Sequence, residues 1–510
     1  MLQVGLLASF LLFFLLPIFV FFFINTLSSF LGSKKSSSQS NKLPRSYPLI
    51  GSSIAIFVNE KRRNQWITDV LKHSPTKTFV LRRAFGDSRI FTANPSNVQH
   101  ILKTQFYLYP KGGFVRQSLS DFLGSGILNA DGGNWKFQRQ ISSHEFNTKS
   151  LRKFVESVVE SELSERLVPI LSNAAAEKSV LDLQDILQRF AFDNICKIAF
   201  GFDPEYLSPS LPKAEFAAAF DEAVLISGIR MNCAFPALWK LKRALGIGHE
   251  RQLRLATSRV RGFAGEVVNE KKRELKERSS LETSDLLSRI LCSGHLDENF
   301  VTDMVISFIL AGRDTTSAAL TWFFWLISGN SRVEDEIVKE IREKREELDY
   351  DEVKDMVYTH AALCESMRLY PPVPSDTKEA AGDDVLPDGT IVKKGMTVIY
   401  HPYAMGRMEE VWGSDWSEFK PERWLMREEE GGKWSFVGRD PYTYPVFQAG
   451  PRICLGKDMA FLQMKRVVAG VLSRFRVVPV VVEEGFEPVY VSYLTSKMKG
   501  GFPVKMEEKG

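Results

Sequence analysis

The sequence predicts a mainly α-helical protein with a smaller β region, preceded by an N-terminal membrane-spanning helix. Three observations lead to this fold class. Residues 151–278 are largely helical by pattern, residues 78–93 and 477–504 have the composition of short strands and turns, and residues 6–24 form one uncharged apolar run. At about 19 residues, that run is long enough to span a bilayer.

Three regions are predicted along the 510 residues: a membrane anchor at 1–33, a Ser/Lys- and Pro-containing linker and hinge at 34–51, and one large domain at 52–510. Lys34 and Lys35 follow the apolar run, so the positive-inside rule places the domain on the cytosolic side. A cleaved signal peptide is the alternative, but residues 2–33 lack the charged start that it requires.

Bulk composition excludes several classes of protein. A hydrophobic content of 44% indicates a globular chain with an ample core, and a net charge of +4 is small for this length and argues against nucleic-acid binding. The five cysteines are an odd number and contain no Cys-x-x-Cys pair. This usage indicates a reducing compartment rather than a disulfide scaffold.

Two segments in the first third of the chain carry local signals. Residues 78–93 alternate around a Gly-Asp turn and predict a hairpin, and Asn94-Pro95 begins a helix. Further on, Trp135 and Arg139 are spaced i, i+4 and lie on one face of a predicted helix. Taken alone, this pair would be an ordinary surface contact between an aromatic ring and an arginine.

Residues 304–327 are almost wholly apolar and predict a helix that is buried all round, about 36 Å long. Its middle contains Ala311-Gly312-Arg313-Asp314-Thr315. A second membrane span is the alternative, but it would put Arg313 and Asp314 near the centre of the bilayer. Gly312 would leave room for a small molecule to approach, and Asp314 with Thr315 forms an acid–alcohol pair able to relay protons.

Glu365 and Arg368 are spaced i, i+3 between apolar residues, which predicts a buried ion pair. A buried pair needs further partners, and Arg423 in Pro421-Glu-Arg-Trp424 is a candidate. Their role would be structural.

The segment Phe447-Gln-Ala-Gly450-Pro-Arg452-Ile-Cys454-Leu-Gly456 predicts a loop just before the helix that begins near Lys457. Glycines permit close backbone approach, and a helix N-terminus favours the thiolate form of a cysteine, which is the form that binds metals. A buried, inert cysteine is one alternative. A phosphate-binding P-loop is another, but the glycine spacing fails and Asp458 stands where Ser or Thr is needed.

At every fixed position, Phe-x-x-Gly-x-Arg-x-Cys-x-Gly matches the haem-binding signature of the cytochrome P-450 superfamily, so the chain resembles that family. The resemblance implies the cytochrome P-450 fold and haem b with an axial thiolate from Cys454. It places Phe447 over the sulfur and Arg452, Trp135 and Arg139 near the haem propionates. Lys378 stands where many members have a propionate-binding arginine, and lysine keeps the charge but not the fork.

The resemblance extends to the other motifs. Ala311-Gly-Arg-Asp314-Thr315 is similar to the oxygen-activating pattern, and Glu365, Arg368 and Arg423 to the triad that supports the loop behind the haem. Electrons would come from NADPH through a cytochrome P-450 reductase, because the chain has no dinucleotide fingerprint. Basic residues near the loop, Lys457, Lys465 and Arg466, are candidates for the docking face. Candidate substrate-pocket residues are Ile127, Leu128, Ile306, Leu310, Ala311, Val373 and Leu494.

Residues 311–325 and 440–457 resemble the plant clan of this family whose members oxidise the terminal carbon of aliphatic chains. This implies a monooxygenase of the endoplasmic reticulum membrane, single-pass, acting on an apolar small molecule. A fatty acid is the first expectation. Terminal hydroxylation of a sterol side chain and of a jasmonate conjugate are the alternatives. A haem-thiolate isomerase and a non-catalytic haem protein are the alternatives from other classes.

Overall fold

The computed structural model describes residues 43–509 except 147–148, 214, 234, 278–284, 293–296, 345–349, 428–432 and 482–486. The predicted anchor at 6–24 lies outside the described residues. Within the described residues, no helix is both long and apolar enough to cross a bilayer. Of the predicted hinge, residues 47–51 form a tight turn in which Tyr47 and Gly51 exchange backbone hydrogen bonds of 2.9 and 2.8 Å.

Helices make up most of the described domain, as the sequence predicts. The α-helices are α2 (Ser53–Val58), α3 (Arg63–His73), α4 (Pro95–Gln99), α5 (Gly112–Leu123), α6 (Gly132–Phe146), α7 (Lys149–Glu162), α8 (Val168–Glu177), α9 (Leu183–Phe200), α10 (Glu215–Asn232), α11 (Pro236–Leu245), α12 (His249–Glu277), α13 (Leu286–Cys292), α14 (Glu298–Ile309), α15 (Thr315–Ser328), α16 (Ser331–Arg342), α17 (Tyr350–Lys354), α18 (Val357–Leu369), α19 (Pro402–Met405), α20 (Glu409–Trp412) and α21 (Lys457–Leu472). Short π-helical segments are η3 (His100–Thr104), η5 (Leu163–Leu167) and η6 (Leu310–Asp314). Short 3₁₀ segments are η1 (Glu60–Arg62), η2 (Ala84–Gly86), η4 (Phe106–Leu108), η7 (Pro421–Trp424), η8 (Pro445–Phe447) and η9 (Gly450–Arg452).

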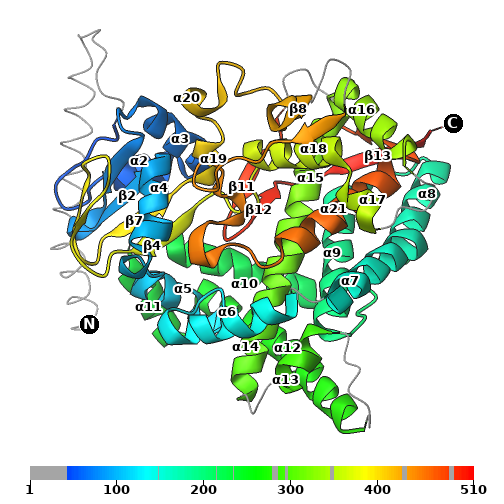
Figure 1. Ribbon diagram of the computed structural model, residues 1–510. Helices are drawn as coiled ribbons and strands as arrows, with labels where there is room; N and C mark the ends of the chain where they lie inside the picture. The colour runs from blue at the N-terminus through cyan, green and yellow to red at the C-terminus, as the bar shows by residue number, and fades with distance from the viewer. Residues whose placement is uncertain are drawn as a thin grey trace, which may run out of the picture. The chain divides into compact units, whose positions relative to one another are not determined.

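The β region is small, and its main sheet lies to the left of the helices in Figure 1, whereas β11 and β12 lie near the centre and β8 and β13 to the right. Its main sheet has the order β1-β2-β7-β4, with β2 parallel to β7 and the other neighbours antiparallel. These strands are β1 (Thr78–Arg82), β2 (Ser88–Thr92), β7 (Thr397–Tyr400) and β4 (Asp376–Glu379). The others are β3 (Leu181–Asp182), β5 (Asp384–Val385), β6 (Ile391–Val392), β8 (Leu425–Arg427), β9 (Trp434–Phe436), β10 (Phe475–Pro479), β11 (Tyr490–Ser492), β12 (Ser496–Met498) and β13 (Pro503–Glu508).

The predicted hairpin at 78–93 is confirmed, because β1 and β2 pair antiparallel with Thr78 opposite Thr92. Asn94 caps α4 by accepting the Ser96 N–H at 2.9 Å, as its position before Pro95 predicts. The C-terminal residues form short strands, of which β10 and β13 pair and β11 and β12 make a hairpin.

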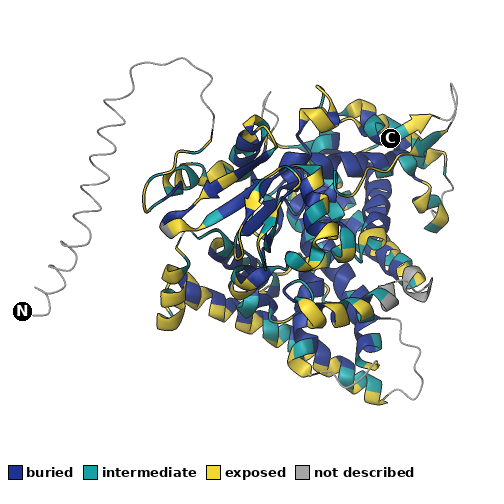
Figure 2. Ribbon diagram, turned by 60° about the vertical axis from the view of Figure 1, so that its left-hand side comes forward, coloured by how far each residue is buried: buried dark blue, intermediate teal, exposed yellow. Residues whose placement is uncertain are grey.

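The central apolar helix is confirmed, but a π-helical turn that the sequence did not predict interrupts it. It runs through α14, η6 and α15, and its residues are buried on nearly all sides. Figure 2 shows the buried residues concentrated inside the domain and the exposed residues on its outer helices and loops. The π-helical turn η6 covers Ala311-Gly-Arg-Asp314, and such turns are frequent at functional sites.

Candidate active site

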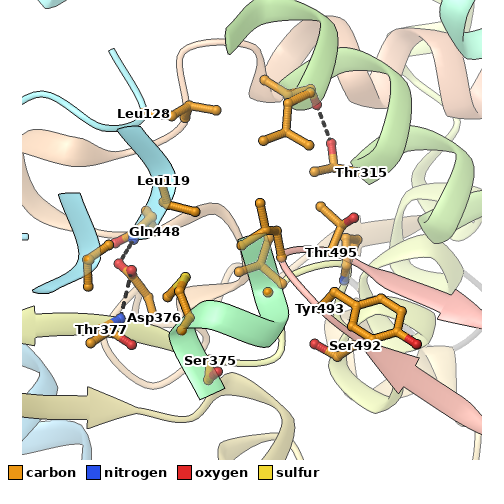
Figure 3. A pocket seen from close by; sticks show the side chains of 18 of the residues that line it. Leu119, Leu128, Thr315, Ser375, Asp376, Thr377, Gln448, Ser492, Tyr493 and Thr495 are labelled. Carbon is orange, nitrogen blue, oxygen red and sulfur yellow. Dashed lines mark hydrogen bonds between the residues drawn. The ribbon is translucent and has the colours of Figure 1, made fainter. Parts of the chain in front are cut away.

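One cavity of about 960 Å³ connects the cysteine loop, the π turn of the central helix and the β11–β12 hairpin. Figure 3 shows Leu119 and Leu128 on one side of this cavity and Ser492, Tyr493 and Thr495 on the other, with Thr315 above Thr495 on that second side. Most of its lining side chains are apolar, so its walls suit a hydrophobic ligand.

The cysteine loop is held by backbone contacts at both of its ends. The Cys454 N–H donates to the Phe447 carbonyl at 2.9 Å, and Gly456 caps the helix α21 that begins at Lys457. Gly450 has φ +64°, and a Cβ there would lie 2.1 Å from the Leu102 carbonyl oxygen. Glycine is therefore required at 450 both by the backbone conformation and by the close approach to η3.

Cys454 is a free cysteine that faces the cavity, two residues before Gly456, the N-cap residue of α21. Burial of its sulfur by the surrounding protein raises its pKa, whereas the Gly456 N–H and the charges of Arg139 and Lys457 lower it. These groups offset only part of the effect of burial, and Asp458 adds to it, so the pKa of the Cys454 thiol stays raised. A soft thiolate facing an apolar cavity is a donor set suited to haem iron.

Three side chains on and beside α6 surround this loop. Arg139 donates to the Ile453 carbonyl at 2.6 Å. Arg452 lies over the Trp135 ring at 4.5 Å and donates to Asp131 at 2.7 Å and to the Ala130 carbonyl at 2.9 Å. The structure therefore brings Trp135, Arg139 and Arg452 together at the cavity, as their predicted common role requires, and all three line it.

Lys378 is placed differently from the expectation. It is 2% exposed, its ammonium lies 2.8 Å from Asp376 Oδ2, and it is not among the residues that line the cavity. Asp376 lines the cavity instead and also accepts from Tyr400 at 3.0 Å and from Gln448, a contact drawn in Figure 3. Successive side chains on one strand face alternate sides, so Asp376 and Lys378 share a face of β4.

Lys111 joins Asp376 and Lys378 in one charged group beside the cysteine loop. Its ammonium is 3.9 Å from Asp376, and burial lowers its pKa to about 8. Burial would raise the pKa of Asp376, but Lys378 and Lys111 outweigh it and hold that pKa far below its usual range. Together with Arg139 and Arg452, Lys111 gives this end of the cavity the positive charge that haem propionates need.

Asp314, the last residue of the π turn η6, and Thr315, the first residue of α15, have different surroundings. Thr315 lines the cavity and donates to the Ala311 carbonyl at 2.6 Å, as Figure 3 shows. Asp314 is 2% exposed, does not line the cavity, and accepts from Thr495 at 3.2 Å and from Arg313 at 3.1 Å. Burial raises the pKa of Asp314, while Arg313 and Lys497 lower it. Thr495 lines the cavity and so connects Asp314 to it.

Packing against α9 gives a further reason for a glycine at position 312. A Cβ at Gly312 would lie 2.6 Å from the side chain of Ile195 on α9. The missing side chain is therefore needed for the close packing of the central helix against α9. Gly312 also lines the cavity, so its predicted role in leaving room for a small molecule stays a prediction.

Glu365, Arg368 and Arg423 form the buried ion-pair group that the sequence predicts. Arg368 Nη2 lies 2.8 Å and Arg423 Nε 3.1 Å from Glu365 Oε1, and the Trp424 indole N–H donates to Oε2 at 2.9 Å. The side chains of Glu365 and Arg368 are fully inaccessible to solvent. Their role in supporting the cysteine loop stays a prediction.

Most of the predicted substrate-pocket residues line the cavity, namely Ile127, Leu128, Leu310, Ala311, Val373 and Leu494. Ile306 does not: it is fully buried in the helical core on the other faces of α14. Phe447 and Gly456 line the cavity as well, and Phe447 packs against Phe461 at 5.2 Å between ring centroids.

The predicted docking face near the cysteine loop is wrong for two of its three residues. Lys465 is 4% exposed and donates to the carbonyls of Val353 and Lys354, and Arg466 is 6% exposed and pairs with Glu156 and Glu160. Lys457 is exposed. Helical spacing alone did not show that α21 is covered by α7 and α17.

Comparison with known proteins agrees with this geometry. The family model described as Cytochrome P450 matches residues 42–489. Cytochrome P450 94A2 of Vicia sativa is 64% identical over 496 residues, 96% of this chain and 96% of that protein. Cytochrome P450 94A1 of Vicia sativa is 60% identical over 92% and 91% of the two chains, and Cytochrome P450 94B1 of Arabidopsis thaliana 48% identical over 97% and 96%.

Fold and site thus define a mainly helical protein in which a cysteine before a helix N-terminus faces a large, mostly apolar cavity. The chain belongs to the cytochrome P450 family. It is therefore a haem-thiolate monooxygenase that receives its electrons indirectly, through a reductase, and acts on a hydrophobic substrate.

Proposed function

We propose that this monooxygenase hydroxylates the terminal carbon of a long aliphatic chain, in the first place that of a fatty acid. The observation that carries the proposal is the apolar cavity that meets both Cys454 and Thr315. A flexible hydrocarbon chain fits such walls, and the resemblance of residues 311–325 and 440–457 to terminal-carbon hydroxylases supports the same substrate class.

Cys454 would hold the haem iron, and Trp135, Arg139 and Arg452 would bind the propionates, with Lys111 as a further cation. When bound, the haem supplies oxygen activation at the thiolate-ligated iron. Glu365, Arg368 and Arg423 would hold the cysteine loop behind it. Each of these assignments uses contacts made by this chain's own side chains around the cavity.

The Thr315 hydroxyl would hold a proton at Oγ1 on the cavity side, where the reaction consumes protons. Asp314 lies behind it and reaches the cavity through the Thr495 hydroxyl, which donates to Asp314 Oδ2 at 3.2 Å. A carboxyl with a pKa raised by burial is able to pass a proton to such a hydroxyl.

Selection of the chain end would rest on geometry. A terminal C–H bond is stronger than an internal one, so the protein must hold the terminal carbon alone within reach. The side chains of Leu128, Leu310, Val373 and Leu494 would narrow the cavity for that purpose. The domain would act at the cytosolic face of the endoplasmic reticulum, anchored by residues 6–24.

Product analysis tests this proposal. Membranes containing the protein and a plant reductase would receive NADPH with either a long-chain fatty acid or a side-chain-oxygenated cholesterol, and mass spectrometry would locate the new oxygen. An ω-hydroxy acid is the expected product. If only the sterol were oxidised, at its terminal methyl, the proposed substrate would be wrong but the proposed attack on a terminal carbon would stand. Oxygen only at internal carbons would contradict the proposal.

A further inference from the structure

A second basic group lines the cavity, separate from the one around Asp376. It consists of Arg89 on β2 and Arg63 on α3, with Arg83 behind them. In Figure 1, β2 and α3 lie to the left, whereas α15 and α21, which flank Thr315 and Cys454, lie nearer the centre. The cavity thus joins this basic group to the cysteine loop.

Arg89 is buried with unsatisfied hydrogen-bonding capacity. Arg89 is 8% exposed, and its guanidinium carbon lies 4.8 Å from the centre of the Phe114 ring. Nη1 donates to the Met231 carbonyl at a long 3.3 Å. Nε is buried without a hydrogen-bond partner, since the closest carboxylate oxygen, on Asp87, is 3.9 Å away. A buried guanidinium nitrogen left unpaired is costly unless a ligand satisfies it.

Arg63 repeats this pattern on the neighbouring element. Its Nε is also buried without a hydrogen-bond partner, and it makes no ion pair with any residue in the described part of the chain. Glu60, which also lines the cavity, acts on it only at longer range.

The acidic residues nearby do not balance this charge. Asp87 is half-exposed and makes its hydrogen bond, 3.1 Å, with Arg83. Burial, followed by the charge of Arg83, lowers the pKa of Arg89 to about 9, so it is still charged at neutral pH. Three arginines thus share one close carboxylate, with Glu60 at longer range, and the excess positive charge faces the cavity.

We propose that Arg89, assisted by Arg63, binds the free carboxylate of the substrate while its hydrocarbon chain runs along the cavity toward Cys454. This inference rests on the proposed function and deepens it, since it makes the substrate an anionic chain rather than a neutral sterol. Arginine suits the role because its planar fork matches a carboxylate. Phe114, Val115 and Leu119, from one helix beside Arg89, would cover the first part of the chain.

Holding one end of the chain also explains how the other end is selected. With the carboxylate fixed at Arg89, the length of the cavity decides which carbon reaches the cysteine loop. Arg89 and Arg63 are therefore positioning residues. The carboxylate of a fatty acid and that of an amino-acid conjugate have the same chemistry, and the experiment has an arm for each.

The test compares binding of lauric acid, methyl laurate and N-lauroyl-isoleucine to the haem-loaded protein by the substrate-induced change of the haem spectrum. We expect the wild type to bind lauric acid about 10- to 100-fold more tightly than its ester, the range for a charge-assisted hydrogen bond. Arg89→Gln should abolish this preference and leave the Kd of the ester unchanged. Arg63→Gln should reduce it, and Arg89→Lys should keep part of it. Tighter binding of the conjugate would identify that source of the carboxylate.

Arg82→Gln is the matched control, because Arg82 is an exposed arginine on the neighbouring strand β1. Thermal unfolding and the unliganded haem spectrum would show that each variant is folded. Equal Kd values for acid and ester in the wild type would overturn the inference, and so would an acid preference that survives Arg89→Gln. If the acid is still hydroxylated at its terminal carbon, the proposed function stands and only the role of Arg89 falls. If neither acid nor ester is hydroxylated, the proposed function falls, and this inference with it.

Discussion

At the scale of the residue, Cys454 depends on neighbours far away in the sequence. Gly450 approaches the Leu102 carbonyl, and Arg139 donates to Ile453, so a loop of few residues is fixed by η3 and α6. This fixation orients the sulfur before any ligand binds. Of the other four cysteines, Cys196, Cys292 and Cys364 do not line the cavity. Cys233 lines it, but beside the basic group formed by Arg89 and Arg63 and not beside the cysteine loop.

Replacing the sulfur gives the first prediction. We expect Cys454→Ala to abolish the thiolate-type carbon monoxide spectrum of the reduced protein, because no other described cysteine faces this end of the cavity. Cys292→Ala is the control, since Cys292 is an exposed free cysteine. A thiolate-type spectrum in the Cys454→Ala protein would show that the central assignment is wrong.

The hydroxyl of Thr315 gives the second prediction. We expect Thr315→Val to lower the yield of hydroxylated product per NADPH oxidised by about a hundredfold, the lower range for a positioned proton donor. Thr321→Val is a matched control, because Thr321 makes the same bond to the carbonyl four residues back, at 2.7 Å, and is buried away from the cavity. Equal losses in both variants would point to helix stability instead of proton delivery.

At the scale of the element, helical spacing predicted which residues share a face but not what covers that face. Trp135 with Arg139, and Glu365 with Arg368, were placed correctly because one helix fixes both members of each pair. Lys465 and Arg466 were misplaced because α7 and the end of α17 cover them. Spacing also did not predict the π turn at Leu310–Asp314, where Gly312 packs closely against Ile195 of α9.

The contact between α18 and η7 carries the third prediction. Glu365→Gln removes the one carboxylate shared by Arg368 and Arg423 and leaves buried positive charge. We expect the free energy of unfolding to fall by about 3 to 5 kcal/mol, with loss of bound haem. Urea unfolding and haem content per protein would measure both effects.

Arg62→Ala is the control for that change. Arg62 pairs with Asp69 at 2.6 Å, a shorter distance than within the triad, but both side chains are more than half exposed. Such pairs contribute at most about 1 kcal/mol. Similar losses in Glu365→Gln and Arg62→Ala would refute the argument that burial decides the cost.

At the scale of the whole molecule, two histidines of the interior, one buried (His401) and one partly buried (His360), predict how stability depends on pH. Burial lowers the pKa of His360 and of His401 from 6.5 to about 3. Since the folded protein binds protons at these sites less readily than the unfolded chain, stability is complete above the ordinary pKa and decreases as pH falls below it. Between about pH 6.5 and pH 5, the free energy of unfolding should fall by about 2 kcal/mol for each histidine.

Urea unfolding at about pH 7 and pH 5 checks this fourth prediction. We expect His360→Phe, which keeps the stacking on Phe461 at 4.0 Å, to reduce the loss of stability on acidification. His249→Gln should not, because His249 is exposed. An unchanged pH dependence in His360→Phe would mean that other groups cause the acid sensitivity.

The sequence by itself determined the mainly helical architecture with its small β region, the hairpin at 78–93, the central apolar helix and the motifs around Cys454, because these depend on local periodicity and on short fixed spacings; the predicted anchor stays a prediction. Only the tertiary structure decided that Asp376 and not Lys378 lines the cavity and that Asp314 reaches it through Thr495. It also decided that Arg89 and Arg63 meet at the cavity, each with a buried Nε that has no hydrogen-bond partner among the described residues. These contacts join residues far apart in the chain, and burial, which sets their charge and their cost, exists only once the elements are packed.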